Sequence, residues 1–153
     1  MTQSTDRIEK QIFIKAPRQR VWRALTDPKE FGQWFRVNLA KGFSAGARTT
    51  GNVTYEGYEH IEFSVTVEQM VPERLLSWRW VPNAIDPARD YSREPTTLVV
   101  FELEEAPGGT LLKVTESGFD KVPSDRRTQA YRGNEQGWGI QVENIARHVS
   151  RPP

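Results

Sequence analysis

The chain has 153 residues, with 21 lysines and arginines against 20 aspartates and glutamates, and a formal net charge of +1. This near balance, with basic residues scattered along the chain, argues against nucleic acid as a partner. The absence of cysteine excludes disulfides, thiol catalysis and cysteine-ligated metal centres. The polar start MTQSTDRIEK and the lack of a long apolar run predict a cytoplasmic protein with no signal peptide and no membrane insertion.

The first part of the chain predicts one strand followed by two short helices. RIEKQIFIKA alternates apolar and polar residues, which indicates a strand at about 7–15. PRQRVWRAL predicts a short helix with its proline in the first turn. In TDPKEFGQWF, Asp27 is a good N-cap, Pro28 suits the first helical position and Glu30 is placed as a capping-box partner, so a second helix is expected at about 28–34.

The middle of the chain predicts an antiparallel meander. GFSAGARTTGN is expected to be loop and weak strand, and four clearer strands follow in HIEFSVTVEQMV, RLLSWRWV, TTLVVFELEE and GTLLKVTESGF. The inward-facing residues of these strands are expected to be Ile61, Phe63, Val65, Val67 and Val71, then Leu76, Trp78 and Trp80, then Val99, Phe101 and Leu103, then Leu112, Val114 and Glu116. The long polar segment between Val81 and Thr96 is typical of a functional rim or lid.

The last segment predicts a helix of about 26 residues, with Ser124 as its N-cap. One face of this helix would carry Arg127, Tyr131, Asn134, Trp138, Val142, Ile145 and Val149. The helix also contains Gly133, Gly137 and Gly139, each costing roughly 1 kcal/mol relative to alanine. Glycines beside Trp138 are expected to let the helix approach the sheet closely or to leave room for a ligand.

Three segments carry a family resemblance: IKAPRQRVWRALTDPKEFGQWF after the first strand, GTLLKVTESGF in the last hairpin, and the GW pair at Gly137 and Trp138. In this order they resemble the SRPBCC or START-like superfamily over about residues 7–149. Within that superfamily, the chain resembles more closely the branch similar to the C-terminal domain of the heat-shock-protein-90 ATPase activator. The resemblance implies an α+β helix-grip fold like that of the birch pollen allergen. In this fold a curved antiparallel sheet wraps around a long C-terminal helix, with two short helices after the first strand, and here a single domain over 7–150.

The same resemblance implies an apolar cavity between the helix and the sheet, which in relatives holds lipids, sterols, polyketides or aromatic hormones. The residues expected to bind a ligand there are Trp34, Phe35, Phe63, Trp78, Trp80, Phe101, Leu112, Val114, Glu116, Tyr131, Asn134, Trp138 and Val142. Glu116 is a weak catalytic candidate because a carboxylate on an apolar strand face suits acid–base work, and Arg127 is a second weak candidate. Several of these aromatic residues could equally fill an ordinary core.

No cofactor or metal site is expected. His60 and His148 are far apart in the sequence and neither has a neighbouring metal ligand. The patterns GxGxxG, GxxxxGK[ST] and GxSxG do not occur, so the sequence supports neither a nucleotide cofactor nor a serine hydrolase.

Three functions follow from these observations. The first is a monomeric or homodimeric protein that binds a small hydrophobic or aromatic molecule without chemistry. The second is a cyclase or aromatase type of enzyme, in which at least two of Glu116, Arg127, Tyr131 and Asn134 would converge within hydrogen-bond distance. The third is a co-chaperone-like interaction domain, which ranks last because the outward strand faces are mostly polar.

Overall fold

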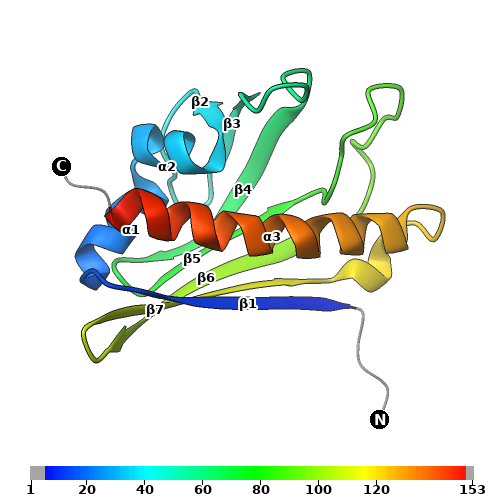
Figure 1. The fold of residues 1–153 in the computed structure, drawn as a ribbon. Helices are drawn as coiled ribbons and strands as arrows, with labels where there is room; N and C mark the ends of the chain where they lie inside the picture. The colour runs from blue at the N-terminus through cyan, green and yellow to red at the C-terminus, as the bar shows by residue number, and fades with distance from the viewer. Residues whose placement is uncertain (1–5, 151–153) are drawn as a thin grey trace, which may run out of the picture.

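The computed structural model describes residues 6–150 and shows one antiparallel sheet with a long helix lying across it (Figure 1). The sheet has seven strands in the order β1-β7-β6-β5-β4-β3-β2. The strands are β1 (Arg7–Ile14), β2 (Val37–Leu39), β3 (Arg48–Val53), β4 (Glu62–Val71), β5 (Leu75–Trp80), β6 (Thr97–Ala106) and β7 (Gly109–Ser117). The helices are α1 (Arg18–Thr26), α2 (Pro28–Phe35), the 3-10 turn η1 (Phe119–Lys121) and α3 (Arg127–Ser150).

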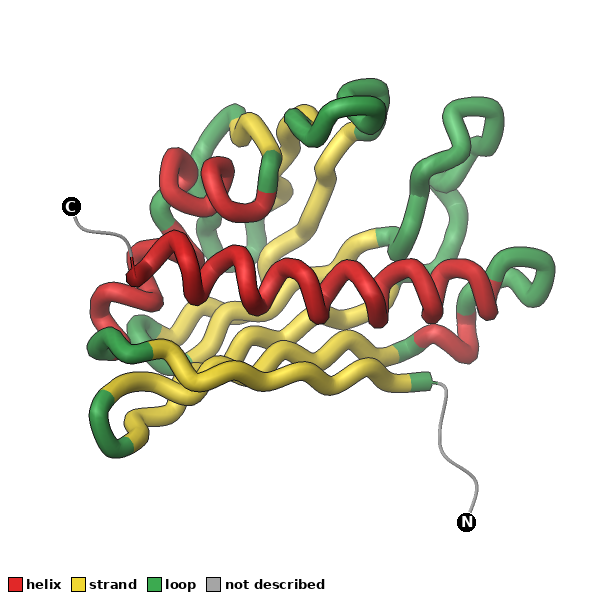
Figure 2. Tube along the Cα trace, viewed as in Figure 1, coloured by secondary structure: helices red, strands yellow, loops and turns green. Residues whose placement is uncertain are grey.

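The concave face of the sheet packs against α3, as the helix-grip fold requires (Figure 2). Alternate residues of β4 to β7 point toward the helix, and the apolar stripe of α3 meets them. On α3 this stripe consists of Ala130, Trp138, Val142, Ile145 and Val149, all buried. The predicted α+β architecture, with its long terminal helix and two short helices after the first strand, is therefore confirmed.

The second short helix has the predicted N-cap. The Asp27 carboxylate accepts hydrogen bonds from the backbone N–H groups of Lys29 and Glu30 at 2.9 and 3.0 Å, and Pro28 occupies the first helical position. α2 ends at Phe35, and its C-cap residue Arg36 adopts the left-handed conformation with φ 69°.

Glu30 has a different role from the predicted capping-box partner. Its carboxylate accepts from Arg20 and Arg23 of α1, each at 2.7 Å, and lies 2.9 Å from the imidazole of His148 near the end of α3. Burial alone would raise the pKa of Glu30, but the hydrogen bonds from His148 and Arg20 and the charges of both arginines lower it below its ordinary value. One carboxylate therefore joins three helices.

The predicted alternation of β4 is wrong at its C-terminal end. The register between β4 and β5 shifts between Val67 and Gln69, which is a β-bulge. Beyond a bulge the strand faces exchange, so Met70 packs against the core and Val71 is 44% exposed.

The last helix and the segment after α2 also differ from expectation. α3 begins at Arg127, and the predicted cap Ser124 lies in the turn before it. The segment expected to be loop and weak strand contributes β3 and follows a three-residue edge strand, β2, that the sequence did not predict. Gly51 permits that pairing, because a Cβ there would lie 2.4 Å from the backbone oxygen of Asn38.

The sheet opens between β4 and β5. β4 pairs with β3 as far as Glu62, but its pairing with β5 stops at Thr66, which lies opposite Arg79. Figure 1 shows the free half of β4 rising away from β5 and carrying β3 with it. Two loops flank this opening: the β3–β4 loop (54–61) and the β5–β6 loop (81–96). Within residues 6–150, none of the helices combines the length and apolar character needed to cross a bilayer.

Candidate functional site

The opening between β4 and β5 leads into a cleft of about 1170 Å³ that extends to α3. Its lining comes from the end of α2, the free half of β4, the end of β5, both flanking loops and one side of α3. The cleft is lined by residues from both sides of the sheet, since Phe63 and Trp80 point toward the core whereas Ser64 and Arg79 point away from it. A cleft of this size can accommodate a drug-sized molecule.

An aromatic wall separates the cleft from the core. Phe35, Phe63 and Trp80 line the cleft, and their ring centroids are 5.4 to 6.4 Å apart. Behind them, Trp78 and Trp138 fill the interior and contact Trp80 at 5.6 and 5.8 Å. Because these inner rings support the wall from behind, the wall is a fixed surface against which a flat apolar molecule can pack.

Exposed apolar side chains gather at the mouth of the cleft. The described residues include six large apolar side chains that are exposed, and four of them line this cleft: Tyr55, Tyr58, Ile85 and Ile140. The two tyrosines pack against each other on the β3–β4 loop, with ring centroids 5.7 Å apart. An apolar rim around an aromatic wall is typical of a ligand-binding groove.

The α3 side of the cleft is formed by glycine and amide side chains. Gly137 lines the cleft, and a Cβ built there would meet no atom within 4 Å. Gly139 is equally free of neighbours but is not part of the lining. Gly133 differs, because its Cβ would lie 3.2 Å from the side-chain oxygen of Asn83 on the β5–β6 loop. The sequence offered two explanations for the glycines, close approach of the helix to the sheet or room for a ligand. Gly137 fits the second, because it leaves open space in the cleft.

Glu116 lies directly beneath the cleft and has no exposed surface. One carboxylate oxygen accepts from the indole of Trp138 and the amide of Asn134, at 2.8 and 2.9 Å. The other accepts from the indole of Trp80 at 2.8 Å and from the hydroxyl of Thr97. All four donors are neutral, so hydrogen bonds alone compensate for the burial of this group.

The β5–β6 loop is fastened to the start of α3. Glu94 accepts from Arg89 at 2.8 Å and from the buried Arg126 at 2.7 Å, and Arg126 also lies over the ring of Tyr91 at 4.9 Å. Arg89 binds Asp125 as well, and this hydrogen bond lowers the pKa of Asp125 below its ordinary value. Ion pairs thus hold the β5–β6 loop, which forms one wall of the cleft, against the start of α3.

The residues that the sequence predicted for ligand binding are divided between cleft and core. Those that line the cleft are Phe35, Phe63, Trp80 and Asn134. Those that are buried behind it are Trp34, Trp78, Phe101, Leu112, Val114, Glu116, Trp138 and Val142. Tyr131 belongs to neither group: it packs against Phe119, and its hydroxyl donates to the backbone oxygen of Arg7.

Two of the four polar residues considered for catalysis come within hydrogen-bond distance of each other, and the other two bind elsewhere. Asn134 and Glu116 are within hydrogen-bond distance of each other, but Arg127 donates to the backbone oxygen of Val122 instead. Among residues 6–150, no three His, Asp or Glu side chains gather closely enough to hold a metal ion.

The sequence did not predict several residues of the cleft and of its polar support. The rim residues lie on loops or on the exposed side of α3, where no periodic pattern marks them. Thr97 could have been found, because it continues the inward face of Val99 and Phe101, as Glu116 continues that of Val114. Two polar residues on the inner faces of adjacent strands are a signal that they bond to each other.

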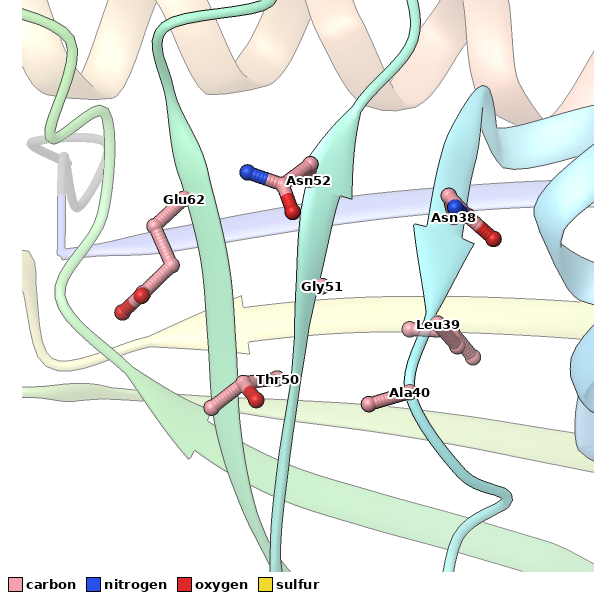
Figure 3. A pocket seen from close by; sticks show the side chains of 7 residues that line it. All are labelled: Asn38, Leu39, Ala40, Thr50, Gly51, Asn52 and Glu62. Atoms are coloured by element: carbon pink, nitrogen blue, oxygen red, sulfur yellow. The ribbon is translucent and has the colours of Figure 1, made fainter.

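A second, smaller pocket of about 210 Å³ lies near the edge of the sheet (Figure 3). It is lined by Asn38, Leu39, Ala40, Thr50, Gly51, Asn52 and Glu62. Figure 3 shows the Glu62 carboxylate directed away from β2, so the polar groups do not converge on one point. We therefore take the larger cleft as the candidate site.

Residues 15–150 match the family model described as activator of Hsp90 ATPase homolog 1-like protein. The chain belongs to this family. A search among curated proteins returned no significant match.

Several solved structures have the same fold as this chain. Protein MLL2253 from Mesorhizobium loti is 26% identical, with a TM-score of 0.76 and coverage of 96% of this chain and 98% of that one. DynU16, described as a protein in the dynemicin biosynthetic locus, is 25% identical with a TM-score of 0.72, and the match covers 94% of this chain and 47% of DynU16. The Aha1 dimer from Colwellia psychrerythraea is 17% identical, with a TM-score of 0.69 and coverage of 94% and 95%.

Proposed function

We propose that this protein binds a small, flat, hydrophobic or aromatic molecule in the cleft between β4, β5 and α3. The observation that carries the proposal is the aromatic wall of Phe35, Phe63 and Trp80 facing a cleft of about 1170 Å³. The apolar rim supports it, because a rim of exposed apolar side chains favours entry of an apolar ligand over water. The family, whose model matches 15–150, is consistent with such a role but does not name a ligand.

A binding role without turnover accounts for the geometry better than an enzymatic one. Both oxygens of Glu116 are occupied by donors, and the carboxylate has no exposed surface from which it could reach a substrate. A general acid or base needs direct or water-mediated contact with the proton that it transfers. Glu116 therefore supports the cleft instead of reacting within it.

The test is to fill the cleft at the position where the helix leaves space. Gly137→Leu places a side chain into the open volume, whereas Gly139→Leu makes the same change on the same helix outside the lining. Binding of polycyclic aromatic compounds would be followed by quenching of tryptophan fluorescence, since Trp80 lies in the wall. We expect saturable binding to the unmodified protein and to Gly139→Leu, and none to Gly137→Leu. Absence of saturable binding to the folded unmodified protein, or equal binding by both variants, would contradict the proposal.

A further inference from the structure

We propose that Asn134 presents its side-chain oxygen to the cleft and so selects ligands that carry a hydrogen-bond donor, with Glu116 as the positioning residue that fixes this orientation. The inference rests on the proposed function, because it concerns the same cleft. It specifies which class of aromatic molecule the cleft prefers: one with a hydroxyl or N–H group at its inner end.

The orientation of the Asn134 amide follows from hydrogen-bond chemistry. Its Nδ2 lies 2.9 and 3.2 Å from the two oxygens of Glu116. A carboxylate only accepts hydrogen bonds, so the NH₂ group must face it and the carbonyl oxygen must point away. The two indole donors occupy the same carboxylate, which leaves no arrangement in which the Asn134 oxygen could replace its nitrogen there.

The Asn134 oxygen is available to a ligand. Asn134 lines the cleft, and no group in the described part of the chain donates to its Oδ1. Two other amides that line the cleft from α3, Gln141 and Asn144, differ in that respect. Asn144 donates to the oxygen of Gln141, and Arg147 donates to the oxygen of Asn144. Asn134 therefore offers the cleft an acceptor that these two amides do not.

Glu116 holds both the Asn134 amide and Trp80 of the aromatic wall. Trp80 and Asn134 donate to the same Glu116 oxygen, at 2.8 and 3.2 Å, so the carboxylate fixes the indole ring and the amide relative to each other. A flat ring packed on Trp80 would carry its donor at a set position toward Asn134. The methyl ether of the same ring system would leave the Asn134 oxygen without a partner, and leaving an acceptor unpaired in the complex lowers affinity by roughly tenfold or more.

The experiment compares 2-naphthol with 2-methoxynaphthalene, in which a methyl group replaces the hydroxyl hydrogen and so removes the donor; Asn134→Leu reports how far the added methyl group alone changes affinity. Dissociation constants would be measured by fluorescence for the unmodified protein, for Asn134→Leu, and for Gln129→Leu, a control that removes an exposed amide of α3 outside the cleft lining. We expect the unmodified protein and Gln129→Leu to bind 2-naphthol about tenfold more tightly than 2-methoxynaphthalene. Asn134→Leu should bind both compounds equally.

A second arm tests Glu116 as the positioning residue. In Glu116→Gln the new amide can both donate and accept, so it no longer forces the NH₂ group of Asn134 to face it. The ratio of the dissociation constants of 2-methoxynaphthalene and 2-naphthol should therefore fall toward one, while 2-methoxynaphthalene still binds. Should that variant not fold, the side-chain amide protons of Asn134 in the unmodified protein supply the test by NMR: bound to Glu116, they should exchange slowly with solvent.

The outcomes separate the two proposals. Equal affinities of the unmodified protein for both compounds, or a preference for the ether, would overturn the Asn134 inference and leave the binding function standing. Failure of the unmodified protein to bind either compound would overturn both. A preference that survives in Asn134→Leu, or rapid exchange of the Asn134 amide protons, would overturn the assignment of the acceptor.

Discussion

Replacing Gly137 or Gly139 with alanine should stabilise the protein. Both residues lie in the interior of α3, where glycine costs about 1 kcal/mol relative to alanine. A methyl group at either position would meet no atom within 4 Å, so no steric penalty offsets the gain. We expect each substitution to raise the free energy of unfolding by about 0.5–1 kcal/mol. In a chain of this size that corresponds to an increase in melting temperature of about 1–4 °C.

The assay is urea and thermal unfolding followed by circular dichroism, which reports on the helix without depending on the tryptophans. Gly133→Ala provides an internal contrast, because its methyl group would lie 3.2 Å from the Asn83 oxygen and should gain less. A loss of stability in both Gly137→Ala and Gly139→Ala would refute the reasoning, since it would mean that the space beside these glycines is filled.

The two substitutions should differ in ligand binding. Gly137→Ala narrows the cleft and should weaken binding of an aromatic ligand, whereas Gly139→Ala, outside the lining, should leave it unchanged. Equal effects of both variants on affinity would show that Gly137 is not retained for the cleft.

Three further predictions concern the carboxylates of Glu116, Glu30 and Glu94, each of which binds several partners. Glu116→Gln should lower the free energy of unfolding by about 2–3 kcal/mol, because the two indoles donate to different carboxylate oxygens and an amide has only one oxygen. The control Glu102→Gln, at an exposed position, should change it by less than about 0.5 kcal/mol. Equal losses of stability in denaturant unfolding of the two variants would contradict this prediction. The pKa of Glu30 is lowered in the folded state, so its contribution to stability is present above the ordinary glutamate pKa of about 4.3 and is lost on further acidification. The stability difference from Glu30→Gln should therefore shrink below that pH, and a difference that grows instead would refute the sign. Glu94→Gln should accelerate amide hydrogen exchange in the β5–β6 loop but not in the middle of α3, and unchanged exchange in the loop would show that its ion pairs do not hold it.

Much of the fold could be predicted from local patterns. The Asp27 cap, the strand alternation and the apolar stripe around Trp138 are each determined by near neighbours in the sequence, and each appears as expected. The exceptions depend on distant contacts. The bulge after Val67 results from how β4 pairs with β5, and Glu30 turns away from its own helix because Arg20, Arg23 and His148 converge on it.

The site was less predictable than the fold. Alternation shows that Trp78 and Trp80 share a strand face, but it cannot show that only Trp80 reaches the cleft. That distinction depends on where the pairing of β4 with β5 ends, which is a property of two strands and two loops together. The odd placement of Glu116 on an apolar face did indicate a special role, and its four donors could only be identified from three-dimensional contacts.

The pairing of β4 with β5 ends at Thr66, and this leaves the width of the cleft mouth independent of the rest of the sheet. Beyond that residue, β4 and β5 share no backbone ladder, so the distance between them can change without breaking a hydrogen bond of the sheet. Insertions or deletions in the β3–β4 and β5–β6 loops would alter the mouth while leaving the contact between α3 and the sheet intact. The size of the cleft mouth is therefore set by the loops and not by the strand pairing of the sheet.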